Sequence, residues 1–228
     1  MVNQRLNKYL AFHLGTSRRE ADDAIAAGDV LINGEIAKLG SRYAIGDSVV
    51  YKGSPVVSRD NHTYLMLNKP EDYVSSRRQQ GDSPTVYALL PEEYHNLKPV
   101  GRLDRNSSGL LLFTDDGDFA HSMTHPSFQK TKEYLATLNT ALEPLHQQMI
   151  SDYGVQLEDG YSKLTLERLD DTRLNWKVVM HEGRNRQIRR TFAALGYDVV
   201  KLHRTTFGPY SLEDLQLGKY VALDIDFK

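Results

Sequence analysis

One stretch near the middle of the chain, residues 98–117, limits the fold and the possible chemistry more than any other part of the sequence. It reads KPVGRLDRNSSGLLLFTDDG, and its Pro and Gly residues favour a loop at its start. The apolar run 110–114 is typical of a short buried strand, which Asp115, Asp116 and Gly117 close as a turn. Arg102 and Asp104 are therefore predicted to lie on a loop that a buried strand anchors, as rigid functional sites often do.

Asp104 by itself is a weak signal, because an aspartate on a loop is usually a turn or capping residue. The surrounding motif, Gly-Arg-Leu-Asp-x-x-Ser-Ser-Gly-Leu-Leu-Leu-Phe-Thr-x-Asp-Gly, resembles the central motif of the RsuA/RluB/RluE/RluF family of pseudouridine synthases. The resemblance implies that the chain converts uridine to pseudouridine in RNA. This isomerisation is redox neutral and transfers no outside group, so neither a cofactor nor a metal is expected.

The composition narrows the alternatives. The 228 residues include 28 Lys and Arg against 30 Asp and Glu, a net charge of −2, so RNA binding would depend on local basic patches. Cysteine is absent, which excludes disulfides, thiolate catalysis and cysteine-based zinc sites. No apolar run reaches the ~20 residues that span a bilayer, and the N-terminus lacks the apolar core of a signal peptide. We expect a cytoplasmic monomer without a membrane segment.

The first fifty residues predict a small separate domain. Leucines at positions 6, 10 and 14 mark one helix, Ser17-Arg-Arg-Glu20 reads as the capping box of a second, and Asn33-Gly34 predicts a hairpin. This order resembles the S4 RNA-binding domain over residues 2–52. A polar, turn-rich linker is expected over 53–62 and a catalytic domain over 63–228.

The resemblance to the S4 domain implies that basic residues on this small domain contact RNA phosphates. They are Arg18, Arg19 and Lys38. From the charge pattern alone, a solvated helix face explains the same residues at least as well. Downstream, strands alternate with helices but many are adjacent hairpins, so the second domain is predicted to be α+β with a mainly antiparallel mixed sheet.

Three further segments resemble conserved elements of the synthase family. Asn68-Lys69-Pro70 ends a predicted strand, and Asp72 stands where the family usually has glycine; aspartate tolerates a positive φ better than most residues. Lys132-Glu-Tyr134 leads into a second strand. Residues 181–196, HEGRNRQIRRTFAALG, place a glycine-containing loop and four arginines before an apolar helix face that Gly196 ends.

The family resemblance implies a role for several of these side chains. Asp104 would be the catalytic carboxylate, and Arg189 would pair with it to keep it ionised in a partly dry cleft. Tyr134 would stack on the uracil and could pass on the proton from its C5 atom. Arg102 would fill the space that a flipped nucleotide leaves, and Ile188 would line the floor of the cleft. The other predicted RNA contacts of the catalytic domain are Lys69, Arg184, Arg186 and Arg190.

Several alternatives stay open at this point. Tyr134 could be an ordinary strand residue, the arginines a solvated face, and His121 with His125 a metal site, although Pro126 ends the helix and no third ligand is evident. Asp104 could attack the ribose C1′ or abstract a ribose proton. The resembled family modifies mostly ribosomal RNA, and residues 182–187 look somewhat more like its members that modify 23S RNA, with a 16S target as the close alternative. The rival functions are RNA binding without catalysis, and a glycoside hydrolase that pairs Asp104 with Asp115 or Asp116.

Overall fold

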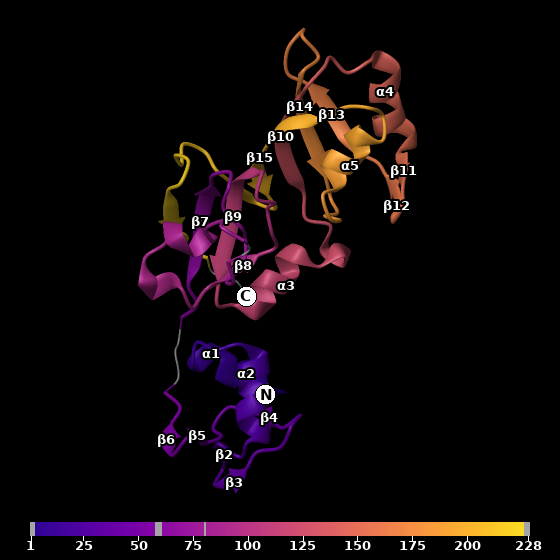
Figure 1. Ribbon diagram of the computed structural model, residues 1–228. Coiled ribbons are helices and arrows are strands. Elements are labelled where there is room, and N and C mark those ends of the chain that lie inside the picture. The colour runs from indigo at the N-terminus through magenta and orange to yellow at the C-terminus, as the bar shows by residue number, and fades with distance from the viewer. Residues whose placement is uncertain (1–2, 58–60, 80, 226–228) are drawn as a thin grey trace. The chain divides into compact units, whose positions relative to one another are not determined.

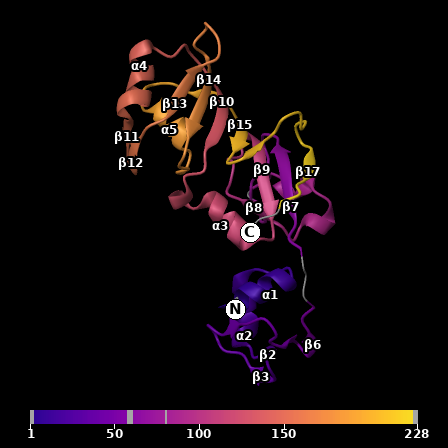
Figure 2. The same cartoon turned by 180° about the vertical axis from the view of Figure 1, so that it is seen from behind.

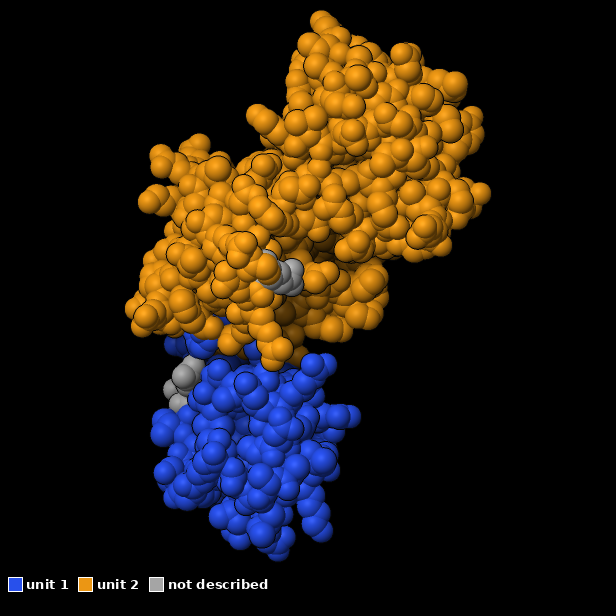
Figure 3. Space-filling view, in the orientation of Figure 1, with its two compact units in different colours: residues 1–63, 96–98 blue, residues 64–95, 99–228 orange. Residues whose placement is uncertain are grey.

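The computed structural model describes residues 3–57, 61–79 and 81–225 (Figure 1). It divides into two compact units, residues 1–63 with 96–98 and residues 64–95 with 99–228 (Figure 3). Residues 58–60 of the linker that was expected over 53–62 lie outside the described part. Within that same stretch, Ser54–Pro55 forms strand β6 and pairs with β5, so the sheet of the small unit continues past residue 52.

The small unit contains two helices and short strands around its own core. Its elements are β1 (Gln4–Arg5), α1 (Leu6–His13), α2 (Arg18–Ala26), β2 (Val30–Ile32), β3 (Glu35–Ile36), β4 (Arg42–Tyr43), β5 (Val49–Tyr51) and β6. The core joins the apolar stripe of α1 to α2 and the sheet, and its members include Leu6, Leu10, Ile25, Val30 and Val49. Packing of these side chains explains why two such short helices are stable, since isolated helices of this length are not.

Two local sequence signals of the small unit are confirmed. The Ser17 Oγ accepts a hydrogen bond from the Glu20 N–H at 3.1 Å, and the Glu20 carboxylate accepts one from the Ser17 N–H at 2.6 Å, which is a complete capping box. Asn33 and Gly34 connect β2 to β3 with φ values of 52° and 85°. Positive φ at both positions is what a type I′ hairpin turn requires.

The large unit is built on one nine-stranded sheet, whose main path has the order β13-β14-β10-β15-β9-β7-β17. The strands are β7 (Tyr64–Lys69), β8 (Lys98–Val100), β9 (Ser108–Thr114), β10 (Lys132–Leu138), β13 (Thr165–Arg168), β14 (Asn175–Met180), β15 (Val199–Phe207), β16 (Tyr210–Ser211) and β17 (Tyr220–Ala222), and a separate hairpin joins β11 (Val155–Leu157) to β12 (Gly160–Ser162). The β9–β15 pair is parallel, whereas pairs such as β7–β9, β10–β14 and β10–β15 are antiparallel, so the predicted α+β class with a mainly antiparallel mixed sheet is confirmed.

The β9–β15 pair joins two halves of this sheet, one containing β7 and β9 and the other β10, β13 and β14 (Figures 1 and 2). The junction is short: His203 lies opposite Ser108, and Arg204 opposite Gly109. A Cβ atom on Gly109 would lie 2.2 Å from the Arg204 carbonyl oxygen, and Gly109 has a φ of 110°. Glycine is therefore required here for the two backbones to approach.

The helices of the large unit begin and end partly as predicted. They are α3 (Gly117–Thr124), α4 (Pro144–Gln148) with a π-helical continuation (Met149–Tyr153), and α5 (Gln187–Ala193); short 3₁₀ turns span Val86–Leu89, Glu92–Tyr94 and Pro126–Phe128. Asp116, predicted to belong to a turn, instead caps α3, because its Oδ1 accepts the N–H groups of Asp118 and Phe119. Among the described residues, no helix is long and apolar enough to cross a membrane.

Candidate active site

The loop that carries Asp104 connects β8 to β9, and hydrogen bonds from a buried lysine hold its backbone. Lys69, at the end of β7, is 0% exposed, and its Nζ donates to the carbonyl oxygens of Ser107 at 2.7 Å and Asp104 at 3.1 Å. It also donates to Pro70 at 2.9 Å and, more weakly, to Arg105 at 3.5 Å. Burial lowers the pKa of Lys69 to about 8. The prediction that Lys69 contacts RNA is thus wrong, because its ammonium group is enclosed by the chain.

Two further residues after β7 hold the same loop. The Ser75 Oγ donates to the Leu103 carbonyl at 2.9 Å and accepts the Leu103 N–H at 3.2 Å. Asp72 accepts from the Arg105 guanidinium at 3.1 Å and has a φ of 69°, the positive value anticipated from the usual glycine. The segment after β7 therefore acts as a support that fixes the backbone on both sides of Asp104.

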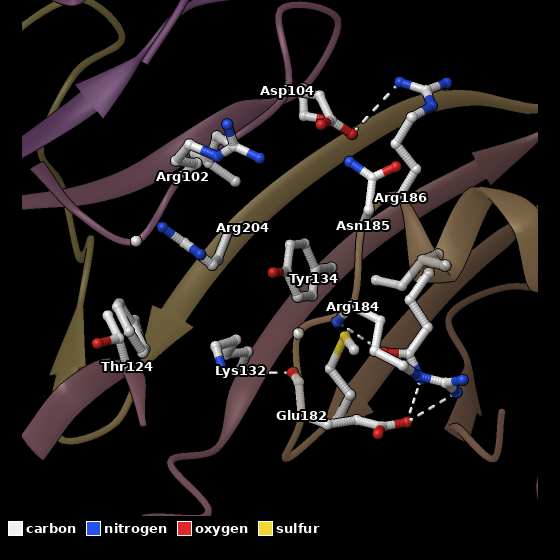
Figure 4. A pocket seen from close by; sticks show the side chains of 18 of the residues that line it. Arg102, Asp104, Thr124, Lys132, Tyr134, Glu182, Arg184, Asn185, Arg186 and Arg204 are labelled. Carbon is white, nitrogen blue, oxygen red and sulfur yellow. Dashed lines mark hydrogen bonds and ion pairs between the residues drawn. The ribbon is translucent and has the colours of Figure 1, made fainter. Parts of the chain in front are cut away.

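A cavity of about 470 Å³ opens beside this loop (Figure 4). Its walls come from the β8–β9 loop, β10, the end of α3, the loop between β14 and α5, and β15. The charged groups in the lining, with histidines taken as neutral, are Arg102, Lys130, Lys132, Arg184, Arg186, Arg189 and Arg204 against Asp104 and Glu182. Seven positive and two negative groups give the lining a charge of +5, in a chain whose net charge is −2. Positive charge is thus concentrated at the cavity.

The carboxylate of Asp104 is paired with Arg186, not with Arg189 as the sequence predicted. Arg186 Nη1 lies 3.3 Å from Asp104 Oδ2 (Figure 4). It also donates to the Asn106 side chain at 3.1 Å. The Arg189 guanidinium instead donates to the backbone carbonyls of Val199 and Asn106. Burial, reinforced by the Arg186 charge, lowers the pKa of Arg189. The physical reason is that Arg186 precedes α5 in a left-handed conformation that turns it towards the Asp104 loop.

Three other predicted site residues line the cavity. Tyr134 is 8% exposed on β10, between Val178 of β14 and Arg204 of β15 in the sheet. Ile188 is 4% exposed at the start of α5. Arg102 is exposed at the rim, two residues before Asp104. The structure thus brings a carboxylate, a phenol, an apolar wall and a free-standing guanidinium to one cavity.

Two of the predicted RNA contacts mainly hold the chain together. Arg190 makes a forked pair with Asp159 at 2.7 and 3.0 Å, and it does not line the cavity. Arg184 lines the cavity, but its guanidinium is bound to Asp159, Glu182 and the backbone of β12. Both arginines fasten the β11–β12 hairpin to α5. Arg190 therefore lies outside the cavity, and its contact with RNA stays a prediction.

The predicted RNA contacts of the small unit are exposed. Arg18 and Arg19 lie in the first turn of α2, where Arg18 donates to the Asn7 side chain at 3.2 Å, and Lys38 follows β3. Exposure makes them available to a phosphate backbone, and their role stays a prediction.

The predicted site residues did not include three basic residues that line the cavity, Lys130, Lys132 and Arg204. Arg204 was missed because the strand was predicted to end at His203, whereas β15 continues to Phe207. Lys132 was visible in the Lys-x-Tyr pattern, and alternation along a strand places it on the same face as Tyr134. Among the described residues, no group of three or more His, Cys, Asp or Glu side chains is placed to hold a metal ion.

Comparison with known proteins matches this arrangement to one family. A profile of the RNA pseudouridylate synthase family matches residues 63–194, and a profile of the S4 domain matches residues 4–49. The chain therefore belongs to the RNA pseudouridylate synthases and has an N-terminal S4 domain.

Individual relatives agree over nearly the whole chain. The Pasteurella multocida protein named ribosomal small subunit pseudouridine synthase A is 36% identical, with 97% of each chain covered. The Bacillus subtilis protein named ribosomal large subunit pseudouridine synthase B is 32% identical, with 94% of this chain and 90% of the relative covered. A crystal structure described as a pseudouridylate synthase is 35% identical, with a TM-score of 0.69 over 97% of this chain and 96% of that one.

The Asp104 partner can be identified by mutation. We expect Arg186→Gln to slow a single turnover about 10- to 100-fold, because a charge-assisted contact to the carboxylate contributes about 1.5–3 kcal/mol. Arg190→Gln is the matched control: it removes the same charge outside the cavity and should leave the rate within about twofold. Rates measured with enzyme in excess over RNA separate the two. A larger loss in Arg189→Gln than in Arg186→Gln would restore the pairing predicted from the sequence.

Proposed function

We propose that this protein isomerises specific uridines of ribosomal RNA to pseudouridine. The observation that carries the proposal is the cavity itself, where Asp104 and Tyr134 meet in a lining with a charge of +5. A polyanion such as RNA is the ligand that this charge favours. The relatives named above act, by their names, on ribosomal RNA of either subunit.

Asp104 supplies the carboxylate for the reaction. The N1–C1′ bond of the uridine breaks, the freed uracil rotates, and a C5–C1′ bond forms; the C5 proton leaves and N1 gains one. The carboxylate either attacks C1′ or abstracts a ribose proton, and in both routes it must be ionised. Arg186 at 3.3 Å favours that form electrostatically, and the backbone contacts from Lys69 hold the loop in place.

Tyr134 and Arg102 complete the proposed site. The phenol ring of Tyr134 lies in the cavity lining, where it can stack on the uracil, and its hydroxyl can pass on the C5 proton. A uridine inside an RNA helix cannot reach Asp104 without being flipped out. Arg102, exposed at the rim, is placed to fill the vacated position. Ile188 supplies an apolar wall against the base.

The target subunit is the finer part of the proposal. We favour a 23S target because the segment 182–187 resembles the large-subunit members of the family, while the relatives include proteins named for either subunit. Pseudouridine mapping of both ribosomal RNAs from cells lacking this protein identifies the target. Loss of a pseudouridine from 23S RNA would support the large-subunit assignment, and loss from 16S RNA the small-subunit one. Unchanged maps of both RNAs would refute the proposed function. We also propose that the protein acts in the cytoplasm as a monomer, and that its substrate is free ribosomal RNA or a ribosome assembly intermediate.

The rival hydrolase is not favoured by the geometry. Asp116 is 6% exposed, caps α3 and accepts a hydrogen bond from the Tyr64 hydroxyl at 2.9 Å. Neither Asp115 nor Asp116 lines the cavity, because β9 separates both from Asp104. Neither Asp115 nor Asp116 can therefore act with Asp104 as the second carboxylate of a glycoside hydrolase. RNA binding without catalysis is the remaining rival, and substitution of Asp104 tests it.

The S4 domain is expected to add affinity through phosphate contacts. The double variant Arg18→Gln/Arg19→Gln in the full chain should weaken RNA binding, and its plot of log Kd against log salt should be shallower by about two. Lys52→Gln is the control, because this exposed lysine lies in the turn between β5 and β6. Equal salt slopes for the wild type and the double variant would show that the start of α2 does not contact RNA.

A further inference from the structure

Two cations beside the proposed catalytic groups share one aromatic ring. Lys132 Nζ lies 5.2 Å from the centre of the Phe207 ring, and the Arg204 guanidinium lies 4.8 Å from it. Phe207 is 1% exposed and Arg204 is 2% exposed, and all three residues line the cavity. Figure 4 shows Lys132 and Arg204 there. Two positive charges so close to one ring repel each other, so this arrangement is costly unless an anion joins it.

An irregularity in the sheet produces this arrangement. The register between β10 and β15 shifts between Glu133 and Tyr134, so that Tyr134 lies opposite Arg204 and Lys132 opposite Phe207. In a regular strand, residues 204 and 207 would point to opposite faces. The extra residue on β15 turns both towards the cavity, as bulges beside active sites often do.

Neither cation has a carboxylate partner among the described residues. Lys132 Nζ donates to the backbone carbonyl of Glu182 at 3.2 Å, while the carboxylate of Glu182 is bound to Arg184 at 3.2 Å and to Gln187. The other acid of the lining, Asp104, is paired with Arg186. Both negative groups of the cavity are thus already engaged. Burial, with the Arg204 charge as the next cause, lowers the pKa of Lys132 to about 8.

Arg204 also has a hydrogen-bonding group that the chain leaves unsatisfied. Its Nε donates to the Leu110 carbonyl at 2.8 Å, but its buried Nη2 has no hydrogen-bond partner among the described residues. An unpaired N–H of a buried guanidinium is expensive, and an acceptor on a bound ligand would remove that cost. The guanidinium fork matches a phosphate particularly well.

We propose that Lys132 and Arg204 form a phosphate-binding pair that holds the backbone phosphate next to the uridine in the cavity. The inference deepens the proposed function and rests on it. Lys132 lies two residues from Tyr134 on the same face of β10, a separation of about 7 Å along the strand. A base stacked on Tyr134 therefore places its own backbone near the pair. The phosphate neutralises the two cations and accepts the free N–H of Arg204, so the bound nucleotide is fixed by its backbone while Asp104 acts on it.

The test measures binding to ribosomal RNA in an Asp104→Asn background, so that no turnover is needed. We expect Lys132→Met to raise Kd about tenfold and to lower the salt slope by about one, because one phosphate contact is lost. Lys201→Met is the matched control: it removes the same charge from an exposed position on β15 and should change neither quantity. Equal salt slopes for the two variants would overturn the inference.

A second arm identifies the atom that is bound. An RNA with a neutral methylphosphonate beside the mapped uridine should bind the Asp104→Asn protein about tenfold more weakly. Adding Lys132→Met to the Asp104→Asn protein should weaken binding of this modified RNA little further, since both changes remove the same contact. If the two fold-losses in affinity multiply, the phosphate and Lys132 do not contact each other, and the inference is overturned. It is also overturned if the effect of Lys132→Met on Kd differs between uridine and cytidine at the target, because the pair would then bind a base carbonyl.

Arg204→Lys keeps the charge but loses the unpaired Nη2, so it should weaken binding less than Lys132→Met and leave the salt slope nearly unchanged. Thermal unfolding of each variant shows that binding is compared between folded proteins. The two hypotheses fail in different ways. Unchanged pseudouridine maps in cells lacking this protein refute the proposed function, whereas equal salt slopes refute only the phosphate pair.

Discussion

Replacement of Asp104 by asparagine is expected to abolish pseudouridine formation, by at least about 10⁴-fold, and to leave the fold intact. Asparagine has nearly the same shape but can neither attack C1′ nor accept a proton. The loop itself is held through backbone atoms, because Lys69 binds the carbonyl oxygen of Asp104 and not its carboxylate. The only side-chain partner that the structure gives this carboxylate among the described residues is Arg186 at 3.3 Å.

Release of tritium from RNA labelled at uridine C5 measures this prediction directly, because C5 exchanges its hydrogen for the new bond to ribose. The Kd for RNA should change by less than about threefold, and the free energy of unfolding by less than about 0.5 kcal/mol. Turnover of the Asp104→Asn variant close to that of the wild type would refute Asp104 as the catalytic carboxylate. A wild-type protein that binds RNA but releases no tritium would leave only the binding function.

Replacement of Lys69 by methionine is expected to destabilise the large unit by about 4 kcal/mol and to reduce turnover strongly. Methionine fills the same space, but the backbone carbonyls around Lys69 Nζ lose their shared donor, and each buried acceptor left without a partner costs about 1–3 kcal/mol. The substitution also removes the desolvation penalty of a buried ammonium group, and this gain partly offsets the cost of the unpaired carbonyls. The Asp104 carbonyl keeps the Ser107 N–H at 3.1 Å as a second donor, so the loss falls mainly on the carbonyls of Pro70 and Ser107, and destabilisation should still win.

Denaturant unfolding and RNA binding together separate support of the loop from RNA contact. The Lys69→Met variant, studied below its unfolding transition, should bind RNA with a Kd and a salt slope close to those of the wild type. Lys201→Met, with the same change of charge on the surface, should keep both stability and turnover. Weakened RNA binding at unchanged stability would instead restore the prediction that Lys69 contacts RNA.

Titration gives an independent check on Lys69. Its pKa is about 8 in the folded protein, below the ordinary value of 10.5, so the folded state loses this proton before the unfolded state does. The unfolding free energy therefore rises with pH between about 8 and 10.5, because the unfolded state binds more protons there. The stability gained in this way is lost again as pH falls to about 8. The difference in unfolding free energy between wild type and Lys69→Met should increase over that window. A constant difference would mean that Lys69 is not buried in its charged form.

Much of the site could be predicted from the sequence, because it depends on local patterns. The loop before the apolar run of β9 contains Asp104, the alternation of β10 places Tyr134, and the apolar face of α5 places Ile188. Local chemistry also decided the Ser17–Glu20 capping box and the Asn33-Gly34 turn. In each case, residues within a few positions of one another make the interaction, so spacing along the chain suffices to find it.

Which groups meet across the sheet was decided only by the tertiary structure. The pairing of Asp104 with Arg186 depends on the left-handed residue before α5, and the burial of Lys69 depends on a loop more than thirty positions away. The site of Lys132 and Arg204 requires a register shift between β10 and β15 that turns Arg204 and Phe207 to the same face. A sequence pattern records which residues alternate, but a bulge forms in response to the neighbouring strand, whose partner and register only the folded chain determines.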